Sequence, residues 1–330
     1  MIDFTKENFT FNKFGGTAKK GTLELDGKTY LIKFKDPIRV THKYKGSYSS
    51  SIFSEDIGCK IYKLLGFETQ NTFLCKCIDN NNKVLCCACE SFVDKEHILI
   101  EFSKCLLSDT RTKSYKDKLT NIEDVQRILN FNEKFQDHPE FEQRFWDMMV
   151  VDTLINNDDR HSDNWGFIIN AKGDDQDIRL APVYDCGSAF SPLVQDEELA
   201  KLIENPGQMS QHEVNFALPF NFNNERVKVI DFFRQPPLEL KTSIKKLVPE
   251  IIEKKEKIFD IIENEEEVSK IRKDFMKASI DLRIKRILKP ALNLCNKPNK
   301  EEFKKKTSSD EIKEIERTDH KKNETRTQKR

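Results

Sequence analysis

The order of hydrophobic and polar positions near the start of the chain indicates strands. Residues 9–14 largely alternate apolar and polar side chains, as a half-buried strand does. Residues 22–25 and 28–34 continue this character on either side of the dipeptide Asp26-Gly27. Asp-Gly between two such runs is typical of a two-residue β-hairpin. The sequence therefore predicts a strand, a loop of small residues and a tight hairpin.

One helix interrupts these strands. Apolar residues recur at helical spacing over residues 52–65, the serines at 49–51 can cap the first turn, and Gly66 can end the last. Two further strands are expected at 71–78 and 83–92, because an asparagine-rich turn separates them. The predicted order is strand, loop, strand, strand, helix, strand, strand.

The rest of the chain has mainly helical periodicity. Residues 96–155 show apolar stripes with charged faces, and residues 238–294 are helical in pattern after a Pro-Pro breaker. Short strands are expected at 166–169 and 178–180, around a polar turn. Residues 297–330 are almost entirely polar and charged. Such a segment has little to bury, so we expect it to be disordered.

These patterns predict an α+β protein with two lobes, in which a small antiparallel-sheet lobe precedes a larger helical lobe. The expected boundaries are residues 1–93 for the first lobe, 94–296 for the second, and 297–330 for the charged tail. A chain of 330 residues is long enough for two lobes with a substantial core.

Composition narrows the function classes. The formal net charge is zero, which argues against direct nucleic-acid binding through a basic surface. No apolar run is long enough to span a membrane, and no secretory signal is visible. Nine cysteines in a chain of this size favour a reducing, cytoplasmic compartment over a disulfide framework. Cys86, Cys87 and Cys89 lack the second spaced pair of a zinc site, so they are interpreted as small apolar residues of a buried strand.

Three side chains after residue 155 carry the candidate chemistry. Asp159 precedes Asn164 by five residues, and Asp185 follows the predicted hairpin. Mg²⁺ prefers oxygen ligands and takes one or two from the protein, which suits Asn164 and Asp185. Asp159 is then free to accept the proton of an attacking hydroxyl. The set predicts phosphoryl transfer from Mg-ATP.

The first lobe offers matching residues for a nucleotide. Lys33, in a predicted strand, can hold phosphate oxygens, and Glu55, in the predicted helix, can hold that lysine. The small-residue loop can cradle phosphate with its backbone N–H groups although it lacks G-x-G-x-x-G. Lys20 could add charge there. The proposed loop residues are Gly15, Gly16, Thr17, Ala18 and Lys19.

Further candidates lie where the two lobes should join. The backbone groups of Glu90 and Phe92 could bond the adenine edge, and Asp94 could reach the ribose. His161 could support the loop or touch the transferred phosphate, and the role of Arg160 stays open. The order of all these parts along the chain is that of a protein kinase.

The run from Asp159 to Asn164, together with Tyr184-Asp185, resembles the HipA-like bacterial serine/threonine kinases. The resemblance covers about residues 14–190 and implies Asp159 as base, Asn164 and Asp185 as Mg²⁺ ligands and Lys33 as ATP ligand. It also implies protein serine or threonine substrates, autophosphorylation with Thr17 as the matching hydroxyl, a role in virulence and action inside host cells.

The resemblance has limits. HipA toxins usually carry an additional N-terminal subdomain, whereas this chain begins almost at the phosphate loop, so an antitoxin partner and operator binding are not expected. Cys186 stands where eukaryotic kinases have a regulatory phenylalanine. A phosphoinositide kinase remains an alternative, because Asp-Arg-His-x-x-Asn also resembles a lipid-kinase loop. A nucleotide-binding scaffold without transfer activity is a second alternative.

Overall fold

The computed structural model describes residues 1–10, 19–35, 37–38, 49–109, 120–172 and 177–297. Contacts divide the chain into two units, Met1–Leu292 and Asn293–Arg330, and the fold described below is that of the first. The lobe boundary at residue 93 therefore remains a prediction. The tail after residue 297, most of the strand expected at 9–14, and loop residues 15–18 lie outside the described residues.

The strands of the first lobe form a five-stranded sheet in the order β1-β4-β5-β3-β2. Its pairs are antiparallel except that β1 runs parallel to β4. The turn residues Asp26 and Gly27 both have positive φ, 50° and 75°, as the tight hairpin requires. Asn80 and Asn81 repeat this at the second turn, so both predicted hairpins are present. The strands are β1 (Ile2–Asp3), β2 (Lys20–Leu25), β3 (Lys28–Phe34), β4 (Thr72–Asp79) and β5 (Asn82–Glu90).

The two faces of this sheet have different roles. Ile32 and Phe34 of β3 point into an apolar cluster on the outer face. Lys33 lies between them, and because side chains alternate along a strand it points to the other face, towards helix α1 (Ser51–Leu64). Cys87 and Cys89 of β5 pair with β3 and are fully buried, as expected of apolar strand residues.

Helix α1 ends as its sequence predicts but begins differently. Gly66, just after the helix, has a φ of 82°, the left-handed conformation that terminates helices. Ser50 is the N-cap residue, yet its side chain makes no capping bond. Instead the Ser49 hydroxyl accepts a hydrogen bond from the N–H of Ser51 at 3.1 Å. A free N–H at the start of the helix is therefore satisfied by Ser49, one residue before the N-cap.

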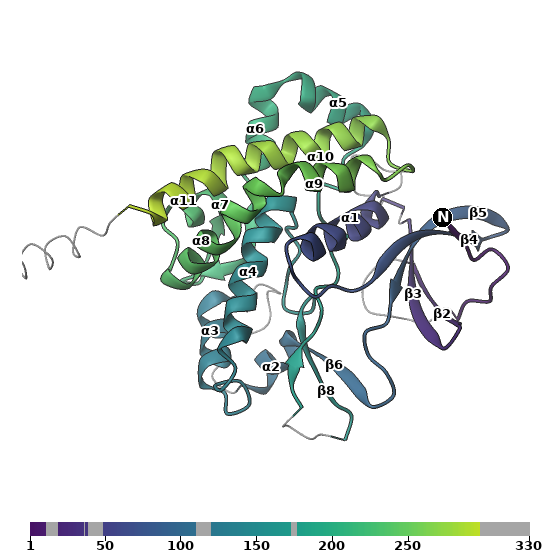
Figure 1. Ribbon diagram of the computed structural model, residues 1–330, viewed down its shortest axis with the longest axis horizontal. Helices are drawn as coiled ribbons and strands as arrows, with labels where there is room; N and C mark the ends of the chain where they lie inside the picture. The colour runs from purple at the N-terminus through teal and green to yellow at the C-terminus, as the bar shows by residue number, and fades with distance from the viewer. Residues whose placement is uncertain (11–18, 36, 39–48, 110–119, 173–176, 298–330) are drawn as a thin grey trace, which may run out of the picture. The chain divides into compact units, whose positions relative to one another are not determined.

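The second lobe is mainly helical, and Figure 1 shows α1 between the five-stranded sheet and these helices. In the described part of the chain no helix is both long and apolar enough to cross a membrane. The helices are α2 (Phe102–Ser108), α3 (Ile122–Phe131), α4 (Pro139–Ile155), α5 (Asp196–Glu204), α6 (Pro206–Val214), α7 (Val229–Arg234), α8 (Leu238–Glu253), α9 (Lys255–Glu263), α10 (Lys270–Arg283) and α11 (Lys289–Cys295), with a π-helical stretch at Ile284–Leu288.

Two small sheets accompany these helices. Strands β6 (His97–Glu101), β8 (Gly166–Asn170) and β9 (Arg179–Leu180) form one of them, in the order β6-β8-β9. The hairpin of β8 and β9 was predicted, but β6 falls in a region expected to be helical. Its short apolar run has no period of its own, and only the pairing with β8 makes it a strand. The other sheet contains β7 (Thr120–Asn121), β10 (Ala217–Phe222) and β11 (Glu225–Lys228).

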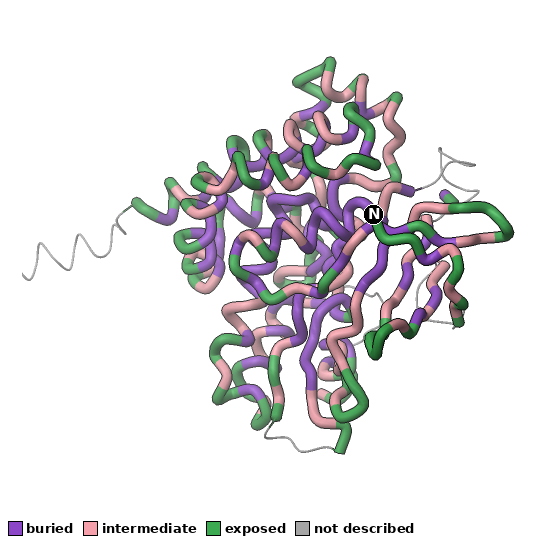
Figure 2. The backbone as a smooth tube through the Cα atoms, turned by 45° about the vertical axis from the view of Figure 1, so that its right-hand side comes forward, coloured by how far each residue is buried: buried purple, intermediate pink, exposed green. Residues whose placement is uncertain are grey.

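The β6-β8 pair fixes the loop that precedes β8. Phe102 and Trp165 stack with ring centroids 4.2 Å apart, and the N–H of Phe102 bonds the carbonyl of Trp165 at 3.0 Å. Figure 2 shows that the backbone in the interior of the molecule is buried while the outer turns are exposed. The end of the α4-β8 loop at Trp165 is therefore held by the core.

We expect Gly166→Ala to destabilise the protein by about 3 kcal/mol. A Cβ at Gly166 would lie 2.2 Å from the carbonyl oxygen of Ile100, and backbone of the paired strand cannot give way easily. Urea denaturation monitored by circular dichroism measures the change. Gly207→Ala is the control, because a Cβ there meets only Asn205 Oδ1 at 3.5 Å. Equal stability of both variants would contradict the close β6-β8 contact.

Candidate active site

Lys33 is the centre of an ionic cluster that joins three distant segments. Its Nζ lies 2.8 Å from Glu55 Oε2 on α1 and 2.9 Å from Asp185 Oδ1, which follows β9. The side chain of Glu55 is fully buried, while that of Asp185 keeps 38% of its surface exposed. The lysine, helix glutamate and aspartate predicted from sequence are thus in direct contact.

The charges in this cluster stabilise one another. Burial acts to lower the pKa of Lys33, but Asp185 and Glu55 outweigh it and raise that pKa well above its ordinary value. The ammonium of Lys33 in turn lowers the pKa of Asp185 to about 2. Near neutral pH the lysine is therefore a cation and Asp185 an anion.

Asn164 is oriented by the backbone of the loop. Its side-chain amide nitrogen donates a hydrogen bond to the carbonyl oxygen of Asp159 at 2.7 Å. The N–H of Asn164 bonds the carbonyl of His161 at 2.9 Å, which closes the loop into a compact turn. Because the amide nitrogen is used inside the loop, the amide oxygen is left as the acceptor that a cation could use.

Asp159 is accessible, and its side chain is 58% exposed. Crowding by protein atoms raises the pKa of Asp159, Asp185 adds to this, and His161 opposes it. His161 Nδ1 accepts a bond from the N–H of Asp163 at 3.2 Å, so its proton belongs on Nε2. That Nε2 lies 3.8 Å from Asp159 Oδ1. His161 therefore sits beside the proposed base and influences its charge.

Arg160 explains how the loop and Asp185 meet. It is only 2% exposed, and its Nε bonds Asp152 Oδ2 of α4 at 3.0 Å. One of its terminal nitrogens donates to the carbonyls of Asn164, at 2.8 Å, and of Tyr184. A single guanidinium thus ties the helix, the loop and the residue before Asp185 together. The sequence left the role of Arg160 undecided, and these bonds indicate that it positions the loop.

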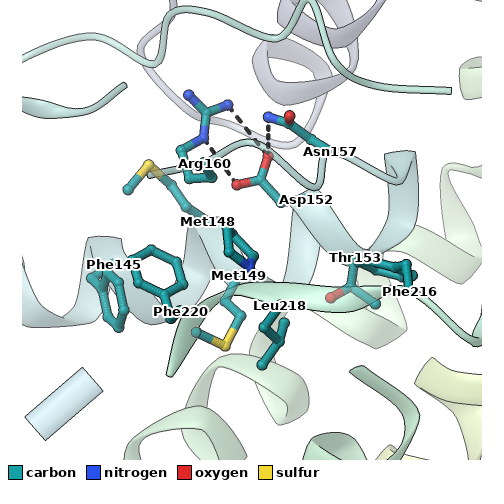
Figure 3. A pocket seen from close by; sticks show the side chains of 11 residues that line it. Phe145, Met148, Met149, Asp152, Thr153, Asn157, Arg160, Phe216, Leu218 and Phe220 are labelled. Carbon is teal, nitrogen blue, oxygen red and sulfur yellow. Dashed lines mark hydrogen bonds and ion pairs between the residues drawn. The ribbon is translucent and has the colours of Figure 1, made fainter. Parts of the chain in front are cut away.

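Below the loop lies a small pocket, seen in Figure 3, whose upper side is the Arg160–Asp152 pair. Asn157 donates a bond to Asp152 Oδ1 at 3.0 Å from the same side. The pocket lies behind the loop and does not include Lys33 or Asp185. Its lining residues are Phe145, Met148, Met149, Asp152, Thr153, Asn157, Arg160, Phe216, Leu218, Pro219 and Phe220.

The backbone at Asp185 is unusual. Its φ is 56°, in the left-handed region that non-glycine residues rarely occupy, although aspartate tolerates it better than most. The preceding residue, Tyr184, packs its ring 5.5 Å from that of Phe92 and donates a bond from its hydroxyl to the Asp163 carbonyl at 3.0 Å. These contacts connect the junction of the lobes with the loop and with Asp185.

Glu90, Phe92 and Asp94, the residues predicted to contact adenine and ribose, differ in whether their polar groups are already hydrogen-bonded. The N–H and C=O of Phe92 make no hydrogen bond within the described residues, so they could meet a base edge. Both backbone groups of Glu90 already have partners, Asn71 and Gln70. Asp94 Oδ1 accepts from the ring nitrogen Nδ1 and the N–H of His97, which makes it part of a turn.

Of the five residues predicted to form a phosphate loop, Lys19 alone lies within the described ranges. Gly15, Gly16, Thr17 and Ala18 lie outside the described residues, so their predicted contacts remain predictions. Lys19 pairs with Asp79 and lies over the ring of Phe34, which belongs to the outer face of the sheet, away from Lys33.

Lys20 is the better placed lysine. It is directly opposite Lys33 in the β2-β3 register, and its charge helps to lower the pKa of Asp185. The turn at Asp26-Gly27 could have revealed this, because a two-residue hairpin fixes which residues face each other. The hydroxyl of Ser188, which lowers the pKa of Asp159, and the carboxylate of Asp152 carry no comparable signal in the sequence.

Comparisons with known proteins agree with this geometry. The HipA-like C-terminal domain family matches residues 12–257. Over 293 residues the chain is 31% identical to the serine/threonine-protein kinase CtkA of Helicobacter pylori strain J99, covering 87% of this chain and 86% of that protein. The chain belongs to the HipA-like family, and it is a serine/threonine protein kinase, as its sequence predicted.

Solved structures show the same relationship. The crystal structure of a Helicobacter pylori proinflammatory kinase CtkA matches with a TM-score of 0.79 at 30% identity, over 89% of this chain and 97% of that one. HipA of Shewanella oneidensis MR-1, solved with HipB and operator DNA, matches with a TM-score of 0.50 at 14% identity, over 88% and 68%. The second match shows the shared fold alone. The predicted two-lobed kinase-like fold is confirmed.

We expect Arg160→Lys to lower kcat by about 100-fold, because an ammonium cannot replace the guanidinium that bonds Asp152 and two carbonyls at once. Steady-state kinetics with saturating ATP measures this effect. Arg179→Lys is the matched control, since Arg179 is exposed on β9. Full activity of Arg160→Lys would show that the loop does not depend on this side chain.

Proposed function

We propose that this chain transfers the γ-phosphoryl group of ATP to serine or threonine hydroxyls of proteins, with Asp159 as the catalytic base. The contact of Lys33 with both Glu55 and Asp185 is the observation that carries the proposal. It supports the proposal because it brings together the strand lysine proposed to bind the nucleotide and the aspartate proposed to bind the metal ion. This support is stronger than sequence order alone, because the three residues come from separate elements.

Asp159 is suited to accept the hydroxyl proton. An exposed carboxylate at the edge of the site can be reached by a side chain of another protein, and its raised pKa makes it a stronger base than an ordinary aspartate. Its backbone carbonyl is held by Asn164, so the position of the base is coupled to that of the proposed ligand. The main contribution of the loop is to orient the hydroxyl and receive its proton.

Asn164 and Asp185 would hold the metal ion, and we propose Mg²⁺. The amide oxygen of Asn164 is left as an acceptor, and the pKa of Asp185 near 2 keeps its carboxylate charged. Two protein oxygens of this kind fit Mg²⁺, which takes its remaining ligands from phosphates and water. When bound, the ion would neutralise charge on the phosphate oxygens.

Lys33 and the junction of the lobes would hold the nucleotide. The ammonium of Lys33 is kept cationic by its two carboxylate neighbours and is suited to phosphate oxygens. The N–H and C=O of Phe92 suit an adenine edge better than the already bonded groups of Glu90. Asp94 is 66% exposed, and its second carboxylate oxygen could still meet a ribose.

Autophosphorylation at Thr17 and a role in bacterial virulence are part of the proposal. The relative of known structure is described as a proinflammatory kinase, which supports a search for host proteins as substrates. An antitoxin partner and the compartment in which the chain acts stay predictions. The lipid-kinase alternative has lost support, because the curated relative is a protein kinase. The inactive scaffold is disfavoured by the assembled Lys33, Glu55 and Asp185.

The proposal is tested by incubating the chain with labelled Mg-ATP, casein and phosphoinositide vesicles. We expect label on protein serine or threonine, including Thr17, and at least a 100-fold loss of transfer in Asp159→Asn, since the base is removed without change of size. Mass spectrometry locates the phosphates. Asp163→Asn is the matched control, because Asp163 lies four residues further along the same loop and is exposed like Asp159. Label in lipid alone, or an active Asp159→Asn, would refute the assignment.

The pH dependence follows from the same groups. The base works only when ionised, so kcat/KM should fall as pH decreases through the pKa of Asp159, which lies above its ordinary 3.8. Asp185, with a pKa of about 2, stays ionised over this range and should not contribute.

A substitution at His161 tests whether the fall of kcat/KM at low pH is caused by Asp159. The electrostatic interaction with His161 lowers the pKa of Asp159, so His161→Gln should shift the acidic limb to higher pH. His138→Gln, at the start of α4, is the control and should leave the limb in place. An acidic limb that does not respond to His161→Gln would belong to another group.

A further inference from the structure

Helix α1 carries Glu55, so its position decides whether the Lys33–Glu55 pair forms. The first half of the helix is bound to the segment after Asp185. The N–H of Ser50 donates to the carbonyl of Pro192 at 2.9 Å, and the hydroxyl of Ser54 donates to the carbonyl of Ala189 at 2.6 Å. These bonds fix the start of α1 to the second lobe.

The middle of the helix packs against the same segment with no side chain between the two backbones. A Cβ built on Gly58 would lie only 2.6 Å from the Cβ of Cys186, which is far too close for a real side chain. Gly58 therefore lets α1 lie directly against the residue that follows Asp185. Because Glu55 is one helical turn before Gly58, this contact sets the distance between Glu55 and Asp185.

The second half of α1 is held by α4 and by Lys254, the residue that follows α8. The hydroxyl of Tyr62 donates to the carbonyl of Met148 at 3.1 Å. The ammonium of Lys254 donates to the carbonyl of Leu64 at 2.8 Å, which satisfies a free carbonyl at the helix end. The helix is thus bonded to the second lobe from its first residue to its last turn.

One ionic chain crosses from the sheet through α1 to the second lobe. Thr72 of β4 donates to Asp56 Oδ1 at 2.9 Å, and Lys60 Nζ lies 2.7 Å from Asp56 Oδ2. Lys60 also pairs with Glu265, in the connection between α9 and α10. Glu265 is 12% exposed and Asp56 only 1%, so the two carboxylates are shielded from solvent, whereas the Lys60 side chain between them keeps 40% of its surface exposed.

We propose that Glu265 is a positioning residue for phosphoryl transfer, which holds α1 through Lys60 so that Glu55 stays bonded to Lys33. The inference rests on the proposed role of Lys33 in binding ATP. Glu265 lies in the α9-α10 connection, outside every motif described above, and would act on the active site only indirectly. On this view, α1 is fixed to the second lobe. The five-stranded sheet is then held in place against α1 through the Lys33–Glu55 pair.

A purely structural ion pair would behave differently from a positioning one. Loss of a structural pair reduces the folded fraction, which lowers the apparent kcat and the melting temperature but leaves KM for ATP unchanged. Loss of positioning weakens the hold of Glu55 on Lys33 in a folded protein. Since Lys33 would bind the phosphates, KM for ATP then rises.

The experiment compares Glu265→Ala with Glu266→Ala, an exposed neighbour of the same charge. We expect KM for ATP to rise about 2- to 10-fold in Glu265→Ala, with an unchanged melting temperature, and to stay normal in Glu266→Ala. Lys60→Arg, which keeps the cation, should retain a normal KM. An unchanged KM in Glu265→Ala, or a lower kcat together with a lower melting temperature, would overturn the inference.

Lys33→Ala separates this inference from the proposed function. If Glu265 acts through Lys33, adding Glu265→Ala to Lys33→Ala should raise KM no further. A raised KM in Lys33→Ala with a normal KM in Glu265→Ala would reject the positioning role alone. A normal KM in Lys33→Ala would reject the role of Lys33 in ATP binding, and the inference with it. Independent, multiplying effects of the two changes would also reject it.

Discussion

The ammonium of Lys33 between the carboxylates of Glu55 and Asp185 is the constraint on which the arrangement of the site depends. A fully buried Glu55 would be costly as an isolated charge, and a buried lysine would lose its proton. Each charge is tolerated because the others are present. The sheet, helix α1 and the segment after β9 must therefore come together at one place, which is also where a nucleotide phosphate would be needed.

A second buried cation does similar work on the other side of the site. Arg160 is almost fully buried, and its guanidinium donates hydrogen bonds to Asp152 and to the carbonyls of Asn164 and Tyr184. These are backbone positions next to the proposed catalytic groups. The interior charge thus fixes the loop without taking part in the chemistry, and the side chains that face solvent, such as Asp159, need not hold the structure together.

The strand and helix pattern of the first lobe could be predicted from sequence because its signals are local. Asp26-Gly27 sets a hairpin, Gly66 ends a helix, and alternation places Lys33 opposite the apolar face. The pairing of Lys33 with Glu55 was expected because a strand lysine followed by a helix glutamate is the order found in protein kinases, whereas the periods alone placed the two residues only on a strand and on a helix. Strand β6 did not follow, because a five-residue apolar run becomes a strand only when β8 lies beside it.

The sequence by itself determined the chemical groups, their order along the chain and the elements that carry them. Tertiary structure decided which of these groups meet. It turned Lys19 towards Asp79, engaged Glu90 in bonds to its neighbours, and buried Arg160 beneath the loop. Contacts such as that of Lys60 with Glu265 join residues about two hundred positions apart. No local pattern encodes such a pair, because its partners are selected only when separate helices pack against each other.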